Sequence, residues 1–147
     1  MRNWYYGGDH PEVPVCYPFY RRVILVDEEV APLLQAAWAL GIATVYSCQE
    51  DDQGMADIGF LRPVDVQCFL AAVFRRQDSF YKRCFPWFNE SEGQHWEFGL
   101  TVDEAPKFNL RYRVAFPRRH MNEVEKRLLA GVRRDGRQLK LIRYQRV

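Results

Sequence analysis

The sequence predicts one α+β domain, residues 1–147, in which an antiparallel sheet carries about three helices. Runs with an apolar period of two alternate with runs whose apolar residues recur every three to four positions. The chain has 147 residues and 48% are apolar, which is enough for one core. The segments follow the order strand, helix, strand, strand, helix, strand, strand, helix, strand. The first half of this order matches a ferredoxin-like or related plait.

Residues 1–20 are expected to form an extended aromatic arm. Pro11, Pro14 and Pro18 fix their φ angles and lack backbone donors, which favours an extended path over the surface. Tyrosine, tryptophan and phenylalanine side chains along this stretch are expected to hold the arm against the body of the domain.

The first strand and the first helix follow directly. Residues 22–26 are apolar, rich in β-branched side chains and of strand length. The helix after them is expected to begin at about Glu29 or Val30, because Pro32 is tolerated only in a first turn. Gly41 favours the left-handed conformation that commonly ends a helix.

A hairpin and a second helix are predicted in the middle of the chain. Residues 43–48 and 55–61 favour strands, and the acidic loop 49–54 is short enough to join them as a hairpin. Pro63 suits the first position of a helix, where its missing N–H leaves no hydrogen bond unmade. An apolar stripe typical of burial on one face follows it.

Two matched runs with a period of two, 94–103 and 109–116, predict a second hairpin. Its pairs are expected to face the core together: Val102 with Leu110, Leu100 with Tyr112, Phe98 with Val114, and Trp96 with Phe116. A third helix follows. It is expected to end at Asp135–Gly136, before a last edge strand at 139–144.

Composition favours a cytoplasmic protein without a membrane anchor. The start of the chain lacks the pattern of a signal peptide, and no stretch approaches the roughly 18 apolar residues that span a bilayer. No two of the four cysteines have the spacing of a zinc or redox motif; they are Cys16, Cys48, Cys68 and Cys84. We therefore expect reduced thiols, and neither a metal nor a cofactor.

Charge is distributed unevenly along the chain. Residues 111–147 form a basic C-terminal segment with a net charge of +9, whereas the first 110 residues carry −7. Such an asymmetry indicates either an acidic partner or an electrostatic match inside the domain.

The stretch 44–54 has the most unusual chemistry, because Ser47, Cys48 and Gln49 end a strand just before an acidic turn. In one interpretation Cys48 is a nucleophile. Neighbouring carboxylates oppose a thiolate, so this interpretation needs a histidine nearby in space. The chain has three: His10, His95 and His120.

Two other interpretations concern the same stretch. Its carboxylates are suited to a hard cation such as Mg²⁺. They are Glu50, Asp51, Asp52 and Asp57. Alternatively, the strand end supports a turn through hydrogen bonds, while Ser47 and Gln49 contact a ligand. We favour this last interpretation, because an acidic turn in solvent is commoner than a metal site.

The segment 80–88 combines five aromatic side chains with two cations. Tyr81 and Trp87 are candidates to stack on a base, while Lys82 and Arg83 hold phosphate. The alternative is a lid that packs its aromatic side chains over the sheet, and this packing role is the commoner one.

The basic segment offers a second candidate surface. Arg111 and Arg113 alternate with core residues, so they are expected to project from the opposite face of the sheet. Together with Arg118 and Arg119 they are suited to bind phosphate. If the acidic region 50–57 instead covers Arg111 and Arg113, they are expected to stabilise the domain.

Three stretches resemble a family of small uncharacterised bacterial and phage proteins. They are H-P-E-V-P at 10–14, A-P-L-L-Q-A-A-W-A-L-G-I-A-T-V-Y-S-C-Q at 31–49, and A-D-I-G-F at 56–60. The resemblance covers the first half of the chain. It implies an origin in a mobile element, where such proteins often bind and block a host factor. It implies no catalytic residue, because the family has no established activity.

Ser47–Cys48 also resembles the Ser-Cys pair that the wybutosine-synthesis methyltransferase family places at a strand end before a hairpin. That family continues with small and basic residues, whereas Gln49-Glu50-Asp51 follows here. The resemblance therefore implies a similar architecture at this strand end and not the same RNA chemistry.

The sequence thus favours a small non-catalytic binding module. It would engage nucleic acid, a nucleotide or a host protein through its basic face and aromatic loop. The chain has no phosphate-binding loop and no EF-hand pattern. The alternative is a small enzyme with its site at the Ser47–Gln49 strand end. A pocket that joins Cys48 or Asp57 to a histidine favours the enzyme.

Overall fold

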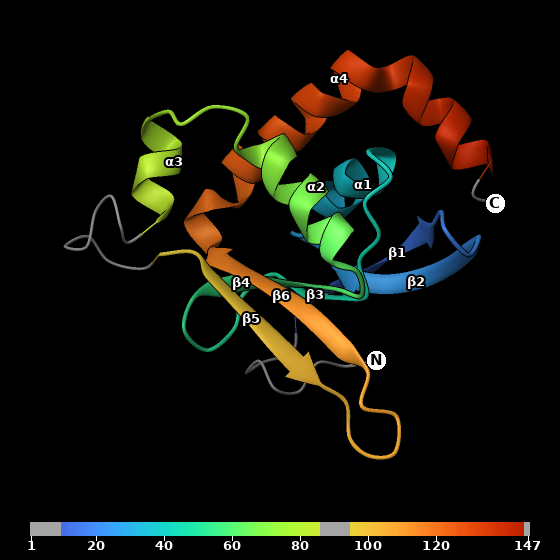
Figure 1. Ribbon diagram of the computed structural model, residues 1–147, viewed down its shortest axis with the longest axis vertical. Helices are drawn as coiled ribbons and strands as arrows, with labels where there is room; N and C mark the ends of the chain where they lie inside the picture. The colour runs from blue at the N-terminus through green and yellow to red at the C-terminus, as the bar shows by residue number, and fades with distance from the viewer. Residues whose placement is uncertain (1–9, 86–94, 146–147) are drawn as a thin grey trace.

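The computed structural model describes residues 10–85 and 95–145, with side chains described up to residue 134. These residues form a four-stranded antiparallel sheet, a separate two-stranded hairpin and four α-helices (Figure 1). The strands are β1 (Glu12–Tyr17), β2 (Arg22–Asp27), β3 (Tyr46–Cys48), β4 (Met55–Phe60), β5 (Glu97–Val102) and β6 (Leu110–Pro117). The helices are α1 (Ala31–Ala39), α2 (Pro63–Val73), α3 (Ser79–Cys84) and α4 (Met121–Gln145), with one 3₁₀ turn, η1 (Arg118–His120). The predicted α+β class is confirmed.

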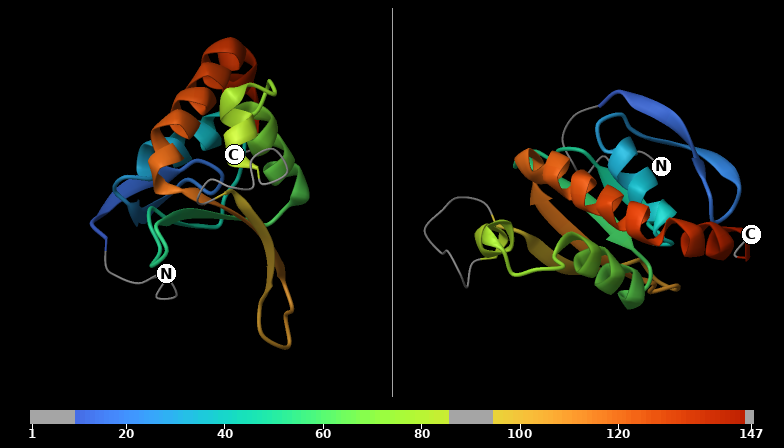
Figure 2. Two further views of the ribbon diagram at one scale, coloured as in Figure 1. Left: turned by 90° about the vertical axis from the view of Figure 1, so that its left-hand side faces the viewer. Right: turned by 90° about the horizontal axis from the view of Figure 1, so that it is seen from above.

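The sheet is built from two hairpins, β3–β4 and β5–β6, which meet where β4 pairs with β6. Its order is β3-β4-β6-β5, and each neighbouring pair is antiparallel. The helices lie on one face of this sheet (Figure 2). The ferredoxin-like order is not confirmed, because β2, the expected first strand, pairs with β1 outside the sheet.

The helix boundaries predicted from proline and glycine are confirmed. Val30 is the N-cap of α1, and Pro32 lies in its first turn. Gly41 follows this helix with a φ of 79°, in the region that favours glycine. Pro63 is the first residue of α2. Local stereochemistry therefore determined where these elements begin and end.

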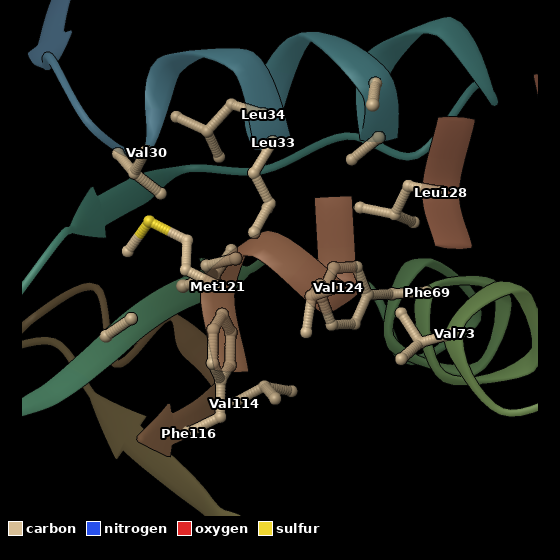
Figure 3. Close-up of a cluster of buried hydrophobic side chains, with 14 of the residues drawn as sticks. Val30, Leu33, Leu34, Phe69, Val73, Val114, Phe116, Met121, Val124 and Leu128 are labelled. Atoms are coloured by element: carbon tan, nitrogen blue, oxygen red, sulfur yellow. The ribbon is translucent and has the colours of Figure 1, made fainter. Parts of the chain in front are cut away.

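The core lies between the sheet and helices α1, α2 and α4 (Figure 3). Its sheet side is formed by inward side chains of the two central strands, and its helix side by apolar stripes. The fully buried members include Ile58, Phe60, Val114 and Phe116 from the sheet, and Leu33, Leu34, Phe69, Val124 and Leu128 from the helices. Burial of each such side chain contributes about 1.5–3 kcal/mol, so this cluster fixes which face the helices cover.

The prediction of an extended arm is wrong for residues 12–17, which form β1 and pair with β2. Val15 and Tyr17 alternate toward the body and are buried. The Tyr17 ring lies 5.2 Å from that of Trp38, which fastens the hairpin to α1. Pro14 is compatible with this strand because a two-stranded hairpin has open edges. Residues 1–9 of the expected arm lie outside the described part of the chain.

The last predicted strand is also wrong, because α4 continues as one helix from Met121 to Gln145. Gly136 costs a helix only about 1 kcal/mol relative to Ala. Leucine, arginine, lysine and glutamine on both sides favour helix and outweigh this cost. No helix in the described residues is both long and apolar enough to cross a membrane.

The register predicted for β5–β6 is confirmed, including Val102 opposite Leu110 and Leu100 opposite Tyr112. The burial predicted for it is wrong in its outer half. Phe98, Leu100, Val102 and Leu110 are 46 to 54% exposed, whereas Trp96, Val114 and Phe116 are buried. The reason is that the hairpin projects beyond the helices (Figures 1 and 2).

Two glycines have different surroundings on the sheet. Gly59 of β4 pairs with Tyr46 of β3, and a Cβ at position 59 would lie 2.0 Å from the Tyr46 ring. The ring therefore occupies the space above this glycine. Gly99 of β5 has no heavy atom of the described residues within 4 Å of its Cβ position, apart from its own neighbours. The sheet is thus closely packed at β3–β4 and open at β5.

Candidate functional site

The strand end predicted at Ser47–Gln49 is confirmed, because β3 ends at Cys48 and leads into the turn before β4. Gln49 fastens this turn to the junction between β2 and α1. Its backbone N–H donates to Asp27 Oδ2 at 2.9 Å, and its side-chain Oε1 accepts from the backbone N–H of Glu29 at 2.8 Å. Gln49 is buried and Ser47 is half-buried, so the predicted ligand role of both stays a prediction.

The acidic residues around this turn have structural partners. Asp51 Oδ1 accepts the backbone N–H groups of Gln53 and Met55, at 2.8 and 2.9 Å. Glu50 pairs with an arginine at 2.6 Å, and Asp57 with another at 2.5 Å. Within the described residues these carboxylates do not gather at one point. Their geometry therefore does not support the Mg²⁺ interpretation.

Cys48 is buried at the end of β3, and its Sγ donates to the carbonyl oxygen of Glu50 at 3.2 Å. Burial raises the pKa of this thiol to about 11, and the charges of Asp27, Asp57 and Asp51 act in the same direction. The thiol is therefore protonated near neutral pH. This agrees with the expectation that neighbouring anions oppose a nucleophilic thiolate, although burial is the larger cause.

One of the three histidines does approach Cys48. A ring nitrogen of His10, a carboxylate oxygen of Asp27 and Sγ of Cys48 all lie within 4.8 Å of one another. The His10 Nε2 atom is 2.7 Å from the carbonyl oxygen of Glu50. Sequence reasoning named His10 as a possible neighbour but missed Asp27, because the three residues come from separate segments.

Another histidine approaches a different cysteine. His120 Nδ1 lies 3.9 Å from Cys84 Sγ and accepts from the indole N–H of Trp96 at 3.1 Å. Burial, with the charges of Arg119 and Arg83, lowers the pKa of His120 to about 4. This ring is therefore neutral and packed within the domain at neutral pH.

The predicted basic face of the sheet is occupied by ion pairs. Arg111 lies 3.2 Å from Asp103, and Arg113 lies 2.5 Å from Asp57 and 3.8 Å from Glu97. Asp57 is fully buried. The structure thus brings Arg113 against the acidic region 50–57, as the second of the two sequence interpretations required. Phosphate binding by this face stays a prediction.

The remaining predicted arginines do not gather with this pair. Arg118, in η1, contacts the carboxylates of Glu29 and Glu50 and so links the 3₁₀ turn to the strand end. Arg119, the next residue, is exposed. The sequence therefore identified basic residues correctly but not the surfaces to which they belong.

The aromatic segment begins with the short helix α3, which the sequence analysis did not predict. Asp78 is its N-cap and accepts the backbone N–H of Tyr81 at 3.0 Å. The Tyr81 ring packs against Phe74 and Phe85, at 5.5 and 4.9 Å between ring centroids. Lys82 and Arg83 are exposed on the last turn. Trp87 lies outside the described residues.

A cleft that the sequence did not reveal lies between the end of α2 and the middle of α4. Its volume is about 210 Å³, and four arginines line it together with Asp78. We call it the arginine cleft; the arginines are Arg75, Arg76, Arg127 and Arg134. They come from segments about 50 residues apart, so no spacing pattern in the sequence indicates it.

The four arginines differ in their partners. Arg127 donates to the carbonyl oxygen of Val73 at 3.1 Å and to Asp78 at 2.8 Å. Its guanidinium also lies 4.5 Å from the centre of the Phe80 ring. The other three are exposed and form no ion pair or hydrogen bond with the residues that the structure describes. Arg127 therefore holds the cleft together, while the others are available to a ligand.

No protein-family model, curated protein or solved structure matches this chain. The two resemblances noted in the sequence therefore stay predictions, and function is argued from the residues themselves.

Proposed function

We propose that the protein is a non-catalytic binding module that holds the phosphate groups of a nucleic acid in the arginine cleft. The observation that carries this proposal is the presence of three exposed arginines without ion-pair partners around one cavity. Like charges held close together repel one another, and a bound anion removes that repulsion. A surface with this arrangement therefore favours an anionic ligand.

The size and chemistry of the cleft favour a phosphate group. Guanidinium groups present paired N–H donors that match the oxygens of a phosphate. The volume of about 210 Å³ is below the roughly 300–1,000 Å³ of sites that enclose a whole small molecule. A cleft of this size is suited to one group of a larger ligand rather than to a complete nucleotide.

The surroundings of the cleft favour a ligand that extends beyond it. Arg83 and Arg119 lie close enough to His120 to lower its pKa, and Arg83 stands 5.9 Å from the same Phe80 ring that Arg127 contacts. Positive charge thus continues from the cleft over α3 to η1. A nucleic acid presents phosphates at regular intervals along such a band, whereas a nucleotide contacts only one part of it.

The proposal is tested by the triple substitution Arg75→Ala, Arg76→Ala and Arg134→Ala. Binding of one short RNA and one short DNA duplex is measured by fluorescence anisotropy over a salt series from about 50 mM, where such contacts are strong. Each lost phosphate contact should make the slope of log affinity against log salt shallower by about 0.9 on duplex or 0.7 on a single strand. A slope shallower by about two to three units is expected.

The matched control is Lys107→Ala, which removes one exposed positive charge at the tip of the β5–β6 hairpin, away from the helices. It should leave affinity and slope nearly unchanged. Wild-type protein that binds neither nucleic acid at about 50 mM salt would overturn the proposal and leave a host protein as the better partner. A triple variant that binds as tightly as the wild type would exclude the cleft.

A second candidate function is the small enzyme at the Ser47–Gln49 strand end. The observation in its favour is that His10 and Asp27 lie beside Cys48. A hydrolytic or transfer activity that is lost on Asp27→Asn but kept in the triple arginine variant would support it.

A further inference from the structure

Three side chains of different chemistry meet beside the turn that follows β3. His10 precedes β1, Asp27 ends β2 and Cys48 ends β3. The β1–β2 hairpin and the contacts of Gln49 with the end of β2 bring these segments together. One ligand atom from each of the three residues lies within 4.8 Å of the others. The three residues supply one nitrogen, one oxygen and one sulfur donor.

Each of the three side chains is oriented by a hydrogen bond to the main chain. Asp27 Oδ2 accepts the N–H of Gln49, and Cys48 Sγ donates to the carbonyl oxygen of Glu50. His10 Nε2 lies 2.7 Å from that same carbonyl oxygen. Because a carbonyl only accepts, a neutral imidazole bonded through Nε2–H keeps a lone pair on Nδ1. Metal-binding histidines are commonly oriented in this way, through the ring nitrogen that does not bind the metal.

We propose that His10, Asp27 and Cys48 form a binding site for a divalent transition-metal ion of the zinc class. A thiolate and an imidazole select such ions over Mg²⁺ and Ca²⁺, which prefer oxygen ligands. Zinc bonds of 2.0–2.3 Å place tetrahedral ligands about 3.3–3.8 Å apart. The ligand atoms therefore need to move together by at most about 1 to 1.5 Å, which side-chain rotation supplies.

The charges around the site also favour a cation. Asp27 and the thiolate of Cys48 together balance the two positive charges of the ion. Glu29 and Glu50 lie on the adjoining segments, and Arg118 pairs with both of them. With three protein ligands, one coordination position stays open to water or to an exogenous ligand, as in catalytic zinc sites. The site does not share residues with the arginine cleft, so the two proposals stand or fall separately.

The experiment uses the full chain, reduced and freed of metal, and Co²⁺ as a probe. Binding of Co²⁺ to a thiolate produces a charge-transfer absorption that carboxylate or imidazole ligands alone do not. We expect this absorption to saturate at one ion per chain and to be displaced by Zn²⁺. Zn²⁺ is also expected to raise the midpoint of thermal unfolding, because it binds the folded form.

Matched variants assign the site. Cys48→Ser should abolish the charge-transfer absorption, while Cys68→Ser, at an exposed cysteine on α2, should keep it. His10→Gln is the variant that keeps the core intact, since His10 is half-buried and precedes β1. It should weaken Co²⁺ binding by about tenfold or more, since even outer partners of a metal ligand have effects of that size.

Three results would overturn the proposal. The first is a wild-type protein without the charge-transfer absorption. The second is Co²⁺ binding that is unchanged in His10→Gln. The third is an absorption that survives in Cys48→Ser but disappears in Cys84→Ser, which would place the metal beside His120 instead.

Discussion

Arginines on the sheet and arginines in the helix layer have different surroundings. Arg113 and Arg118 are ion-paired with carboxylates of other elements. Arg75, Arg76 and Arg134 line the arginine cleft and form no ion pair with any residue that the structure describes. The comparison teaches that the net charge of a segment does not locate a binding surface. Much of the +9 charge of residues 111–147 is balanced within the domain.

The largest effect on stability is expected from Arg113→Ala. This substitution removes the guanidinium that lies 2.5 Å from the fully buried carboxylate of Asp57. Breaking a buried ion pair from one side costs about 3–5 kcal/mol, because the other charge stays buried. The free energy of unfolding in urea at neutral pH measures this loss.

Arg111→Ala is the matched control, since Arg111 lies on the same strand and pairs with Asp103 while both are about one-third exposed. Such a pair contributes about 1 kcal/mol or less. Equal losses in the two variants would show that burial of Asp57 does not distinguish the pairs.

A smaller effect is expected from Arg127→Ala, which tests whether one wall of the arginine cleft is structural. This side chain is mostly buried, donates to the carbonyl oxygen of Val73, pairs with Asp78 and lies over the Phe80 ring. Loss of hydrogen bonds from a charged group costs about 1.5–3 kcal/mol. Urea unfolding measures it, with the exposed Arg133→Ala as control. Unchanged stability would place Arg127 with the unpaired arginines.

The smallest effect on stability is expected from Arg75→Ala, Arg76→Ala and Arg134→Ala taken singly. Each changes an exposed residue without a described partner, so unfolding should shift by no more than about 0.5 kcal/mol. At low salt a slight gain is expected, because repulsion within the cleft falls. Thermal unfolding at two salt concentrations measures both. A loss near 2 kcal/mol would mean that these arginines stabilise the fold, and the contrast with Arg113 would disappear.

The β5–β6 hairpin shows how much of the fold the sequence could predict. Alternation gave the register, because it determines which side chains point to the same face. It did not give burial, because alternation does not say whether another layer covers that face. Leu100 and Val102 therefore point toward the helix side, yet they are exposed beyond the helices.

The end of the chain shows a different limit. Asp135–Gly136 is a common stop signal, and the sequence analysis gave it priority over the helix-forming residues on both sides. In the structure the surrounding residues prevail, and α4 continues to Gln145. A local signal was weighed against a sum of small propensities, and the sum was the larger.

The candidate sites were less predictable than the fold. The strand end at Cys48 could be recognised, because a strand that leads into an acidic turn is visible in the sequence. Its neighbours His10 and Asp27 lie 38 and 21 positions away, and the arginine cleft joins residues about 50 positions apart. Such pairings depend on how hairpins and helices pack, which periodicity within one element does not contain.

The contact between Tyr46 and Gly59 has a consequence for how this sequence is able to diverge. Because the ring fills the place of a side chain at 59, neither position is free to change alone. Any larger residue at 59 requires a smaller one at 46, so the two positions are expected to vary together among descendants of this chain. Gly99, whose Cβ position is open, carries no such constraint and is expected to drift on its own.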